Sequence, residues 1–152
     1  MHHWIDFAAE APEIAEAGQK LLYQFGLGLG FLATIRADGA PRLHPICPVL
    51  HEGGLYALIG PNPKQKDLLR DGRYALHSFP PPKGDHEFYL NGRVVRADAL
   101  ESAVRANFVA SGGTSSNDEV CFELLLGSAM LSLHSDPPKW SPVYSTWRSS
   151  RL

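Results

Sequence analysis

The sequence predicts a mainly β fold with flanking helices, arranged as a small antiparallel barrel of about six strands. Short segments rich in β-branched and aromatic residues recur along the chain and are separated by turn signals. Glycine and proline supply 14 and 12 of the 152 residues, which favours many turns and therefore many short strands. Short connections between neighbouring strands favour antiparallel pairing. The length fits a single domain over residues 1–152.

Composition and charge limit the classes of function. The chain is 44% hydrophobic and 20% charged, and its net charge is -2. This balance gives no electrostatic reason to expect a nucleic acid or an anionic membrane as the main partner. The sequence has no signal-peptide pattern and no apolar run of the roughly 20 residues that span a bilayer. Its two cysteines, Cys47 and Cys121, cannot form a disulfide framework, so we expect a reduced, cytoplasmic protein.

Three helices are expected, over 10–25, 64–71 and 99–110. Pro12 suits the first turn of the first helix, where a missing N–H costs nothing. Apolar residues recur at helical spacing and would form one face of that helix: Ile14, Ala17, Leu21 and Phe25.

The expected strands cover 31–36, 42–51, 55–59, 73–79, 87–96 and 120–134. Asp38-Gly39 is a strong hairpin signal between the first two. Pro45 and Pro48 cannot donate to a ladder, so part of the second strand should lie at a sheet edge or a bulge.

Segment 87–96 contains Asn91-Gly92, a dipeptide that by itself predicts a tight hairpin. The alternative is one long strand with a glycine bulge. We favour the long strand, because a hairpin here would have arms of only about four residues, which is short for a stable pair.

Several motifs resemble functional sites but lack the required context. Gly26, Gly28 and Gly30 follow a helix and precede a strand, the reverse of a dinucleotide-binding turn. The segment 60–64 lacks the Gly-Lys-Ser/Thr ending of a phosphate loop. A metal site formed by His44, Cys47 and His51 is not expected on a strand. Side chains alternate between the two faces, so His44 and Cys47 point in opposite directions, and Cys47 and His51 lie too far apart along the strand to bind one ion. No Ser-His-Asp set suggests a catalytic triad.

The segment 42–47 carries the first useful signal. Alternation places Arg42, His44 and Ile46 on one face, which should line something polar. The other face is apolar and should be core; it carries Leu43, Pro45 and Cys47.

The second signal is the segment 61–69, which joins a strand end to a helix start. Free N–H groups at a helix N-terminus attract anions, and Lys64 and Lys66 add positive charge. The segment is therefore a candidate phosphate cradle; the alternative is a solvated basic turn.

The third signal is the tail. Trp140, Trp147 and Arg148 could cover a planar ligand by stacking. Alternatively, the tryptophans seal the barrel or a subunit contact.

With these residues in view, the chain resembles the pyridoxamine 5'-phosphate oxidase-like split β-barrel family. The resemblance rests on FLATIRADGAPRLHPICPVL, GLYALIGPNPKQKDLLRDGRYALHSF and EFYLNGRVV, and more weakly on 122–126. It implies a six-stranded split barrel that forms a homodimer. It also implies a flavin-type cofactor, FMN or the related deazaflavin coenzyme, in grooves between the subunits.

The resemblance carries the family's cofactor contacts onto particular positions. Lys64 matches the phosphate-binding lysine, and Arg42 or His44 matches the first cofactor contact that the family makes from a strand, often an arginine. Segment 57–63 would border the ring system and the ribityl chain. The full set of expected cofactor-binding residues is Arg42, His44, Ile46, Leu58, Ile59, Gly60, Asn62, Lys64, Lys66 and Trp147.

Two departures from the family pattern affect the expected chemistry. The family's Ser-Arg-Lys is Asn62-Pro63-Lys64 here, so one guanidinium is lost; Lys66 replaces its charge but not its bidentate geometry. The tail 147–152 lacks the arginine-rich pattern of true pyridoxamine phosphate oxidases, so we expect another substrate.

The leading hypothesis is an oxidoreductase that transfers hydride between its cofactor and a small organic substrate. The alternative is a non-catalytic flavin or haem binder on the same fold, with His44, His77 or His134 as haem ligands. A third reading is a barrel without a cofactor that acts through its dimer surface.

Overall fold

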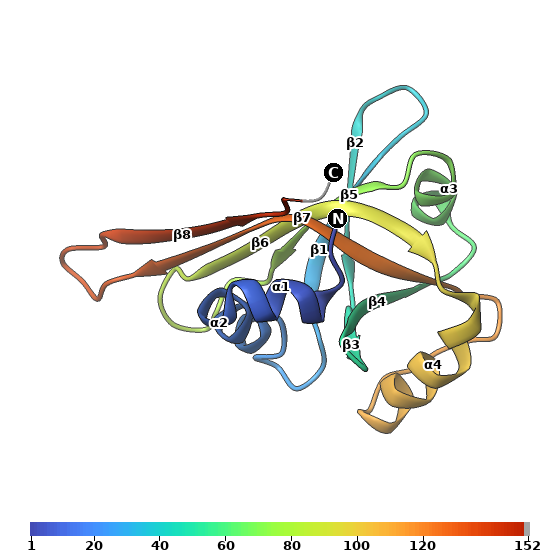
Figure 1. Cartoon of the computed structure of the whole chain (residues 1–152), viewed down its shortest axis with the longest axis horizontal. Coiled ribbons are helices and arrows are strands. Elements are labelled where there is room, and N and C mark those ends of the chain that lie inside the picture. The colour runs from blue at the N-terminus through green and yellow to red at the C-terminus, as the bar shows by residue number, and fades with distance from the viewer. Residues whose placement is uncertain (151–152) are drawn as a thin grey trace.

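The computed structural model describes residues 1–150, so the end of the predicted tail lies outside the described residues. The described chain forms an eight-stranded antiparallel sheet (Figure 1). The strand order is β2-β1-β5-β6-β7-β4-β3, with β8 also paired to β7. The strands are β1 (Gly30–Ile35), β2 (Pro41–Ile46), β3 (Val49–His51), β4 (Gly54–Ile59), β5 (Arg73–Ser78), β6 (Glu87–Arg96), β7 (Val120–His134) and β8 (Pro142–Arg148).

The sheet differs from the prediction in two places. The expected strand 42–51 is divided into β2 and β3 around Cys47-Pro48, because proline interrupts the ladder there. The strand β8 lies in the tail, where no alternating pattern marks it, and it pairs with β7 to form a long hairpin. The fold class is nevertheless the predicted one, mainly antiparallel β with flanking helices.

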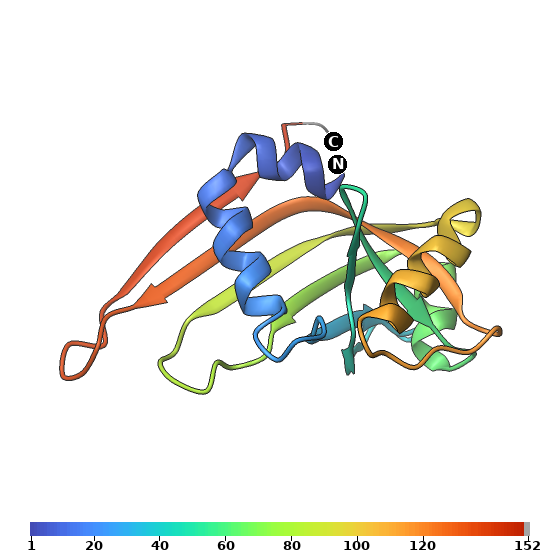
Figure 2. The same ribbon diagram turned by 90° about the horizontal axis from the view of Figure 1, so that it is seen from below.

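The helices are α1 (Trp4–Glu10), α2 (Pro12–Leu22), α3 (Pro63–Arg70) and α4 (Glu101–Ala110), with a short 3-10 turn at Asp98–Leu100. The predicted helices 64–71 and 99–110 are confirmed. The predicted helix 10–25 is too long, because α2 ends at Leu22 and Phe25 lies beyond it, half exposed. The seven-residue α1 was not expected. Figure 2 shows α1 and α2 across the sheet, with α4 towards its other end.

Strand β6 is one long strand with an irregularity between Asn91 and Gly92, as the favoured interpretation predicted. The backbone of β7 comes very close at this point: a Cβ added to Gly92 would lie 1.9 Å from the carbonyl oxygen of Leu125. Only glycine fits this approach without moving the strands apart.

Gly92→Ala is therefore expected to destabilise the fold by about 1–3 kcal/mol, the usual effect of overpacking a well-packed site. Urea denaturation of both proteins measures the difference. Gly127→Ala is the matched control on the facing strand, because a Cβ there first meets an atom at 3.5 Å. Equal loss in the two variants would contradict the close-approach argument.

Strand β7 organises the sheet because both of its edges are occupied. One edge pairs with β6 along most of its length. The other edge pairs with β4 at 120–123 and with β8 at 128–134. His2 fills the gap between them, because its backbone exchanges two hydrogen bonds with Leu126, at 3.0 and 2.8 Å. The first residues of the chain thus complete the sheet edge.

The core lies on the side of the sheet that α1 and α2 cover. The Phe88 ring packs directly against Gly18 of α2. Strand pairing places Arg42, His44 and Ile46 on this inner side, opposite Thr34, Leu32 and Gly30.

The expectation that Leu43 and Pro45 face the core is therefore wrong. Both point to the outer side, and Leu43 is 64% exposed. The reason is that β2 is an edge strand, whose inner face turns its polar residues towards α3. The outer face carries a row of directly opposed residues from β2 across to β7: Pro45, Phe31, His77, Tyr89 and Met130.

Among the described residues, no helix is long and apolar enough to cross a membrane.

Candidate functional site

The start of α3 is fixed by side chains from the loop that precedes it. The Asn62 side chain caps the helix by accepting a hydrogen bond from the backbone N–H of Gln65, at 3.3 Å. The Gln65 side chain in turn donates to the carbonyl oxygen of Ile59 at the end of β4, at 2.7 Å. Pro63 occupies the first turn, as suits a residue without an N–H. The helix therefore leaves β4 in one defined direction.

A buried carboxylate fastens α3 to the sheet. Asp67 Oδ2 accepts hydrogen bonds from Thr34 Oγ1 of β1 at 3.0 Å and from Arg42 Nε of β2 at 2.7 Å. Asp67 Oδ1 lies 3.3 Å from Arg70 Nη1. Burial acts to raise the pKa of Asp67, but the hydrogen bonds from Arg42, Thr34 and Arg70 outweigh it and hold that pKa below its ordinary value. The carboxylate is thus ionised at neutral pH.

Lys64 lies one helical turn before Asp67, close to β2. Burial lowers the pKa of Lys64 below its usual range. Burial also lowers the pKa of His44, and the positive charges of Lys64 and Arg42 lower it further. Burial raises the pKa of the Cys47 thiol, while Lys64 acts in the opposite direction. These side chains therefore form one polar cluster beside the start of α3.

The cluster has an excess of positive charge that the chain does not neutralise. Within residues 1–150, the Lys64 ammonium has no hydrogen-bond or ion-pair partner. The Asp67 carboxylate is already shared between two arginines. His44 is neutral at pH 7, so it can donate or accept a hydrogen bond without adding charge.

The structure does not bring Lys64 and Lys66 to the same spot. The charge of Lys64 acts on the pKa values of His44 and Cys47, whereas Lys66 lines a pocket of about 330 Å³ with Arg42 and residues of the β1–β2 turn. Residues two apart on a helix do not share a face, which explains the separation. The expectation that Lys66 replaces the lost guanidinium at one shared phosphate therefore needs correction.

The apolar residues of the predicted set lie behind this cluster. Ile46 and Ile59 are buried in the main core. Leu58 points to the other side of β4 and packs against a second hydrophobic cluster of Val49, Tyr56, Val104 and Cys121. Gly60 leaves open space beside the site, since a Cβ there would meet only the Asn62 amide nitrogen, at 3.8 Å.

Trp147 lies away from this cluster and is used inside the chain. Its ring is only 9% exposed and packs on Phe7, with ring centroids 4.9 Å apart. Its indole Nε1–H donates to Glu10 Oε2 at 2.9 Å. Such a ring cannot also stack on a ligand. Trp147 therefore seals the protein interior, which was the alternative interpretation of the tail. Trp140 lies in the β7–β8 turn and is 47% exposed.

Sequence reasoning missed Asp67 and Thr34, which set the geometry of the site. A signal for Asp67 was available: it lies three residues after Lys64 and directly before Leu68, on the inward side of a short helix. Thr34 offered no comparable signal, because a threonine in a strand is unremarkable.

The histidines considered as haem ligands lie in three different places. His44 belongs to the cluster at α3. The His77 ring is on the outer face, 3.5 Å from Glu87. His134 lines a pocket of about 460 Å³ with His86 and Trp140. In the described part of the chain, no three His, Cys, Asp or Glu side chains are grouped to hold a metal ion.

Comparison with known proteins shows similarity in fold. No family model matches the sequence, and no curated protein matches it. Several solved structures are similar. A Listeria innocua protein provisionally assigned as a pyridoxamine 5'-phosphate oxidase has a TM-score of 0.62 and 18% identity, over 76% of this chain and 95% of its own.

Two further structures have described ligands or roles. PhzG from Burkholderia lata, solved in complex with tetrahydrophenazine-1-carboxylic acid, has a TM-score of 0.67 and 12% identity, over 97% of this chain and 88% of its own. HutZ, the haem storage protein of Vibrio cholerae, has a TM-score of 0.57 and 17% identity, over 76% and 89%. The chain therefore has the pyridoxamine 5'-phosphate oxidase-like split-barrel fold, as the sequence resemblance implied.

The electrostatics of the cluster can be tested directly. In Lys64→Ala, the pKa of His44 should rise towards its ordinary value of about 6.5, because one of the charges that lowers it is gone. NMR titration of the histidine ring protons measures this pKa. Lys66→Ala is the matched control and should leave it unchanged, since Lys66 does not act on His44. The same His44 pKa in both variants and the unaltered protein would contradict the geometry.

Proposed function

We propose that the chain is a homodimeric redox protein that holds FMN, or the related deazaflavin coenzyme, between β2 and the start of α3. The observation that carries the proposal is the part-buried Lys64, which has no counter-ion in residues 1–150. Keeping an unpaired ammonium away from water is costly, and a phosphate group would offset that cost. The helix N-terminus beside it favours the same negative charge.

The residues present fit such a cofactor. Lys64 and one or both Nη atoms of Arg42 would hold the phosphate, because only the Nε of Arg42 is bonded to Asp67. His44, neutral and on the same face, would contact the phosphate or the ring edge without adding charge. The backbone of 58–60 would run along the ring and the ribityl chain. When bound, a flavin-type ring supplies the hydride chemistry; the protein binds and orients it.

The cofactor proposal predicts a titration result. FMN added to the purified protein should change the visible spectrum of the flavin, and Lys64→Ala should weaken binding about 10- to 100-fold, as loss of one charge-assisted contact does. Lys139→Ala, an exposed lysine in the β7–β8 turn, is the control and should bind like the unaltered protein. Unchanged affinity in Lys64→Ala would overturn the phosphate assignment. Deazaflavin coenzyme titrated in the same way identifies the preferred ring.

The proposed dimer uses the outer face of the sheet. Leu43 is 64% exposed on β2, and β1, β5 and β6 add Ala33, Ala75 and Tyr89 to the same face. The described helices cover the opposite side of these strands. A second copy of the chain would remove this apolar surface from water.

A charge placed on the outer face should prevent dimer formation. Leu43→Glu is expected to sediment as a monomer, since two buried carboxylates would oppose each other across a twofold interface. Val109→Glu is the matched control, because Val109 is 50% exposed on α4, away from this face. If the unaltered protein sediments as a monomer at micromolar concentration, the dimer proposal is wrong. If the protein dimerises but Leu43→Glu remains dimeric, another surface forms the contact.

Haem binding without turnover is the second candidate. It is favoured by the pocket that His134 and His86 share, in which the backbone N–H of His134 donates to His86 Nδ1 at 3.0 Å. The Nδ1 atom of His134 is buried and has no hydrogen-bond partner among the described residues. Haemin belongs in the same titration series, and a Soret band with haemin alone would favour this candidate.

A further inference from the structure

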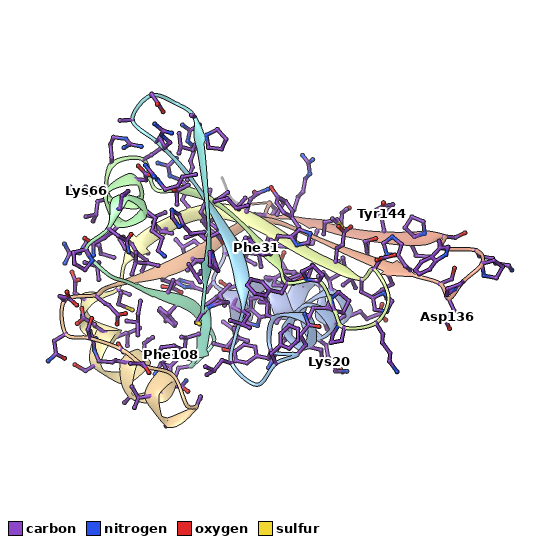
Figure 3. The ribbon with its side chains drawn as sticks, turned by 180° about the vertical axis from the view of Figure 1, so that it is seen from behind. Lys20, Phe31, Lys66, Phe108, Asp136 and Tyr144 are labelled. Carbon is purple, nitrogen blue, oxygen red and sulfur yellow. The ribbon has the colours of Figure 1, made fainter. Side chains whose placement is uncertain are left out.

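The pocket on the Lys66 side of α3 is distinct from the cluster around Lys64. Its walls come from the β1–β2 turn, from β2 and from α3 (Figure 3). Four cationic side chains line it, Arg36, Arg42, Lys66 and Arg70, together with two carboxylates, Asp38 and Asp67. The formal charge of the lining is therefore +2.

Hydrogen bonds and ion pairs within the protein hold two of the cationic side chains of this pocket in place. Asp67 is buried and holds both Arg42 and Arg70, at 2.7 and 3.3 Å. The Nη2 atom of Arg70 donates a hydrogen bond to the carbonyl oxygen of Ile35 at the end of β1. The two guanidinium groups are thus fixed before any ligand arrives, which reduces the ordering cost of binding.

Lys66 and Arg36 are the other two cationic side chains of the pocket, and neither is held by Asp67. In the described residues the Lys66 ammonium has no ion-pair or hydrogen-bond partner. Arg36 is paired only with the exposed Asp38, with 2.9 Å between the charged atoms. An exposed pair of this kind is worth little, so its guanidinium can turn to a ligand.

We infer that this pocket binds a phosphate group carried by a ligand other than the proposed cofactor. A phosphate dianion matches the charge of +2, whereas a single carboxylate would neutralise only half of it. Cations that approach from three elements suit a tetrahedral group better than a planar one. The pocket shares Arg42 with the proposed cofactor site, but Lys64 and His44 do not line it, so the inference does not require the proposed function.

The probe is inorganic phosphate, titrated into the full-length protein without flavin and followed by calorimetry. Saturable binding is expected. Lys66→Ala should weaken it about 10-fold, through loss of one charge-assisted contact. Asp38→Asn should strengthen it a few fold, because it removes a negative charge from the wall while its amide oxygen can still accept from the N–H of Ala40. A gain in affinity cannot result from misfolding.

Lys64→Ala separates this site from the proposed cofactor site. It removes the lysine of the proposed cofactor site, which can itself take up free phosphate, and should leave the affinity of the site that responds to Lys66→Ala within about twofold, since screening weakens the effect of charges outside the pocket. Loss of phosphate binding in Lys64→Ala, or no response to Lys66→Ala and Asp38→Asn, would overturn the inference. Binding that does not saturate by about 10 mM phosphate would overturn it too, because a Kd that weak is typical of a solvated basic surface. The FMN titration is read separately, so either proposal can fail alone.

Discussion

The contact between Asp67 and its three donors is the interaction on which the candidate sites depend. It joins α3 to β1 and β2, which pair with each other as neighbouring strands of the sheet. Breaking one side of a buried charged pair typically costs about 3–5 kcal/mol, because the other charge stays buried and unpaired. With α3 held in this way, Lys64 faces one side of the helix and Lys66 the other. One carboxylate therefore positions the side chains of both proposed anion sites.

Strand β2 has two roles because alternation gives it two unlike faces. Arg42 and His44 point inwards to the candidate site, while Leu43 and Pro45 point outwards. If two copies pair on the outer face as proposed, the interface and the cofactor site are separated by the thickness of one strand. Packing at the interface would then fix the position of the site residues. The proposed cofactor site would then depend on dimer formation.

Local chemistry explains how much of the structure could be predicted. The Asp38-Gly39 turn, the bulge at Gly92 and the start of α3 depend on residues close in sequence, and each was predicted. The direction in which Leu43 points depends on whether the other face of β2 is covered, which no local pattern states. The enclosure of Trp147 depends on Phe7 and Glu10, about 140 residues earlier in the chain. The same distinction applies to the candidate site. Lys64 was predicted because it follows a local turn motif, whereas the hydrogen bond between Thr34 and Asp67 joins residues far apart in the sequence and was missed.

The pairing of His2 with Leu126 has a consequence for the way the chain folds. Residues near the two ends must meet before the edge of β7 is complete, and the His2 ring is then enclosed with Nδ1 2.7 Å from Ser149 Oγ. Contacts so distant in sequence form late, because the entropy of closing a long loop must be overcome first. On the ribosome, His2 lacks its backbone partner Leu126 until β7 has been synthesised. His2 is thus expected to reach its native position late.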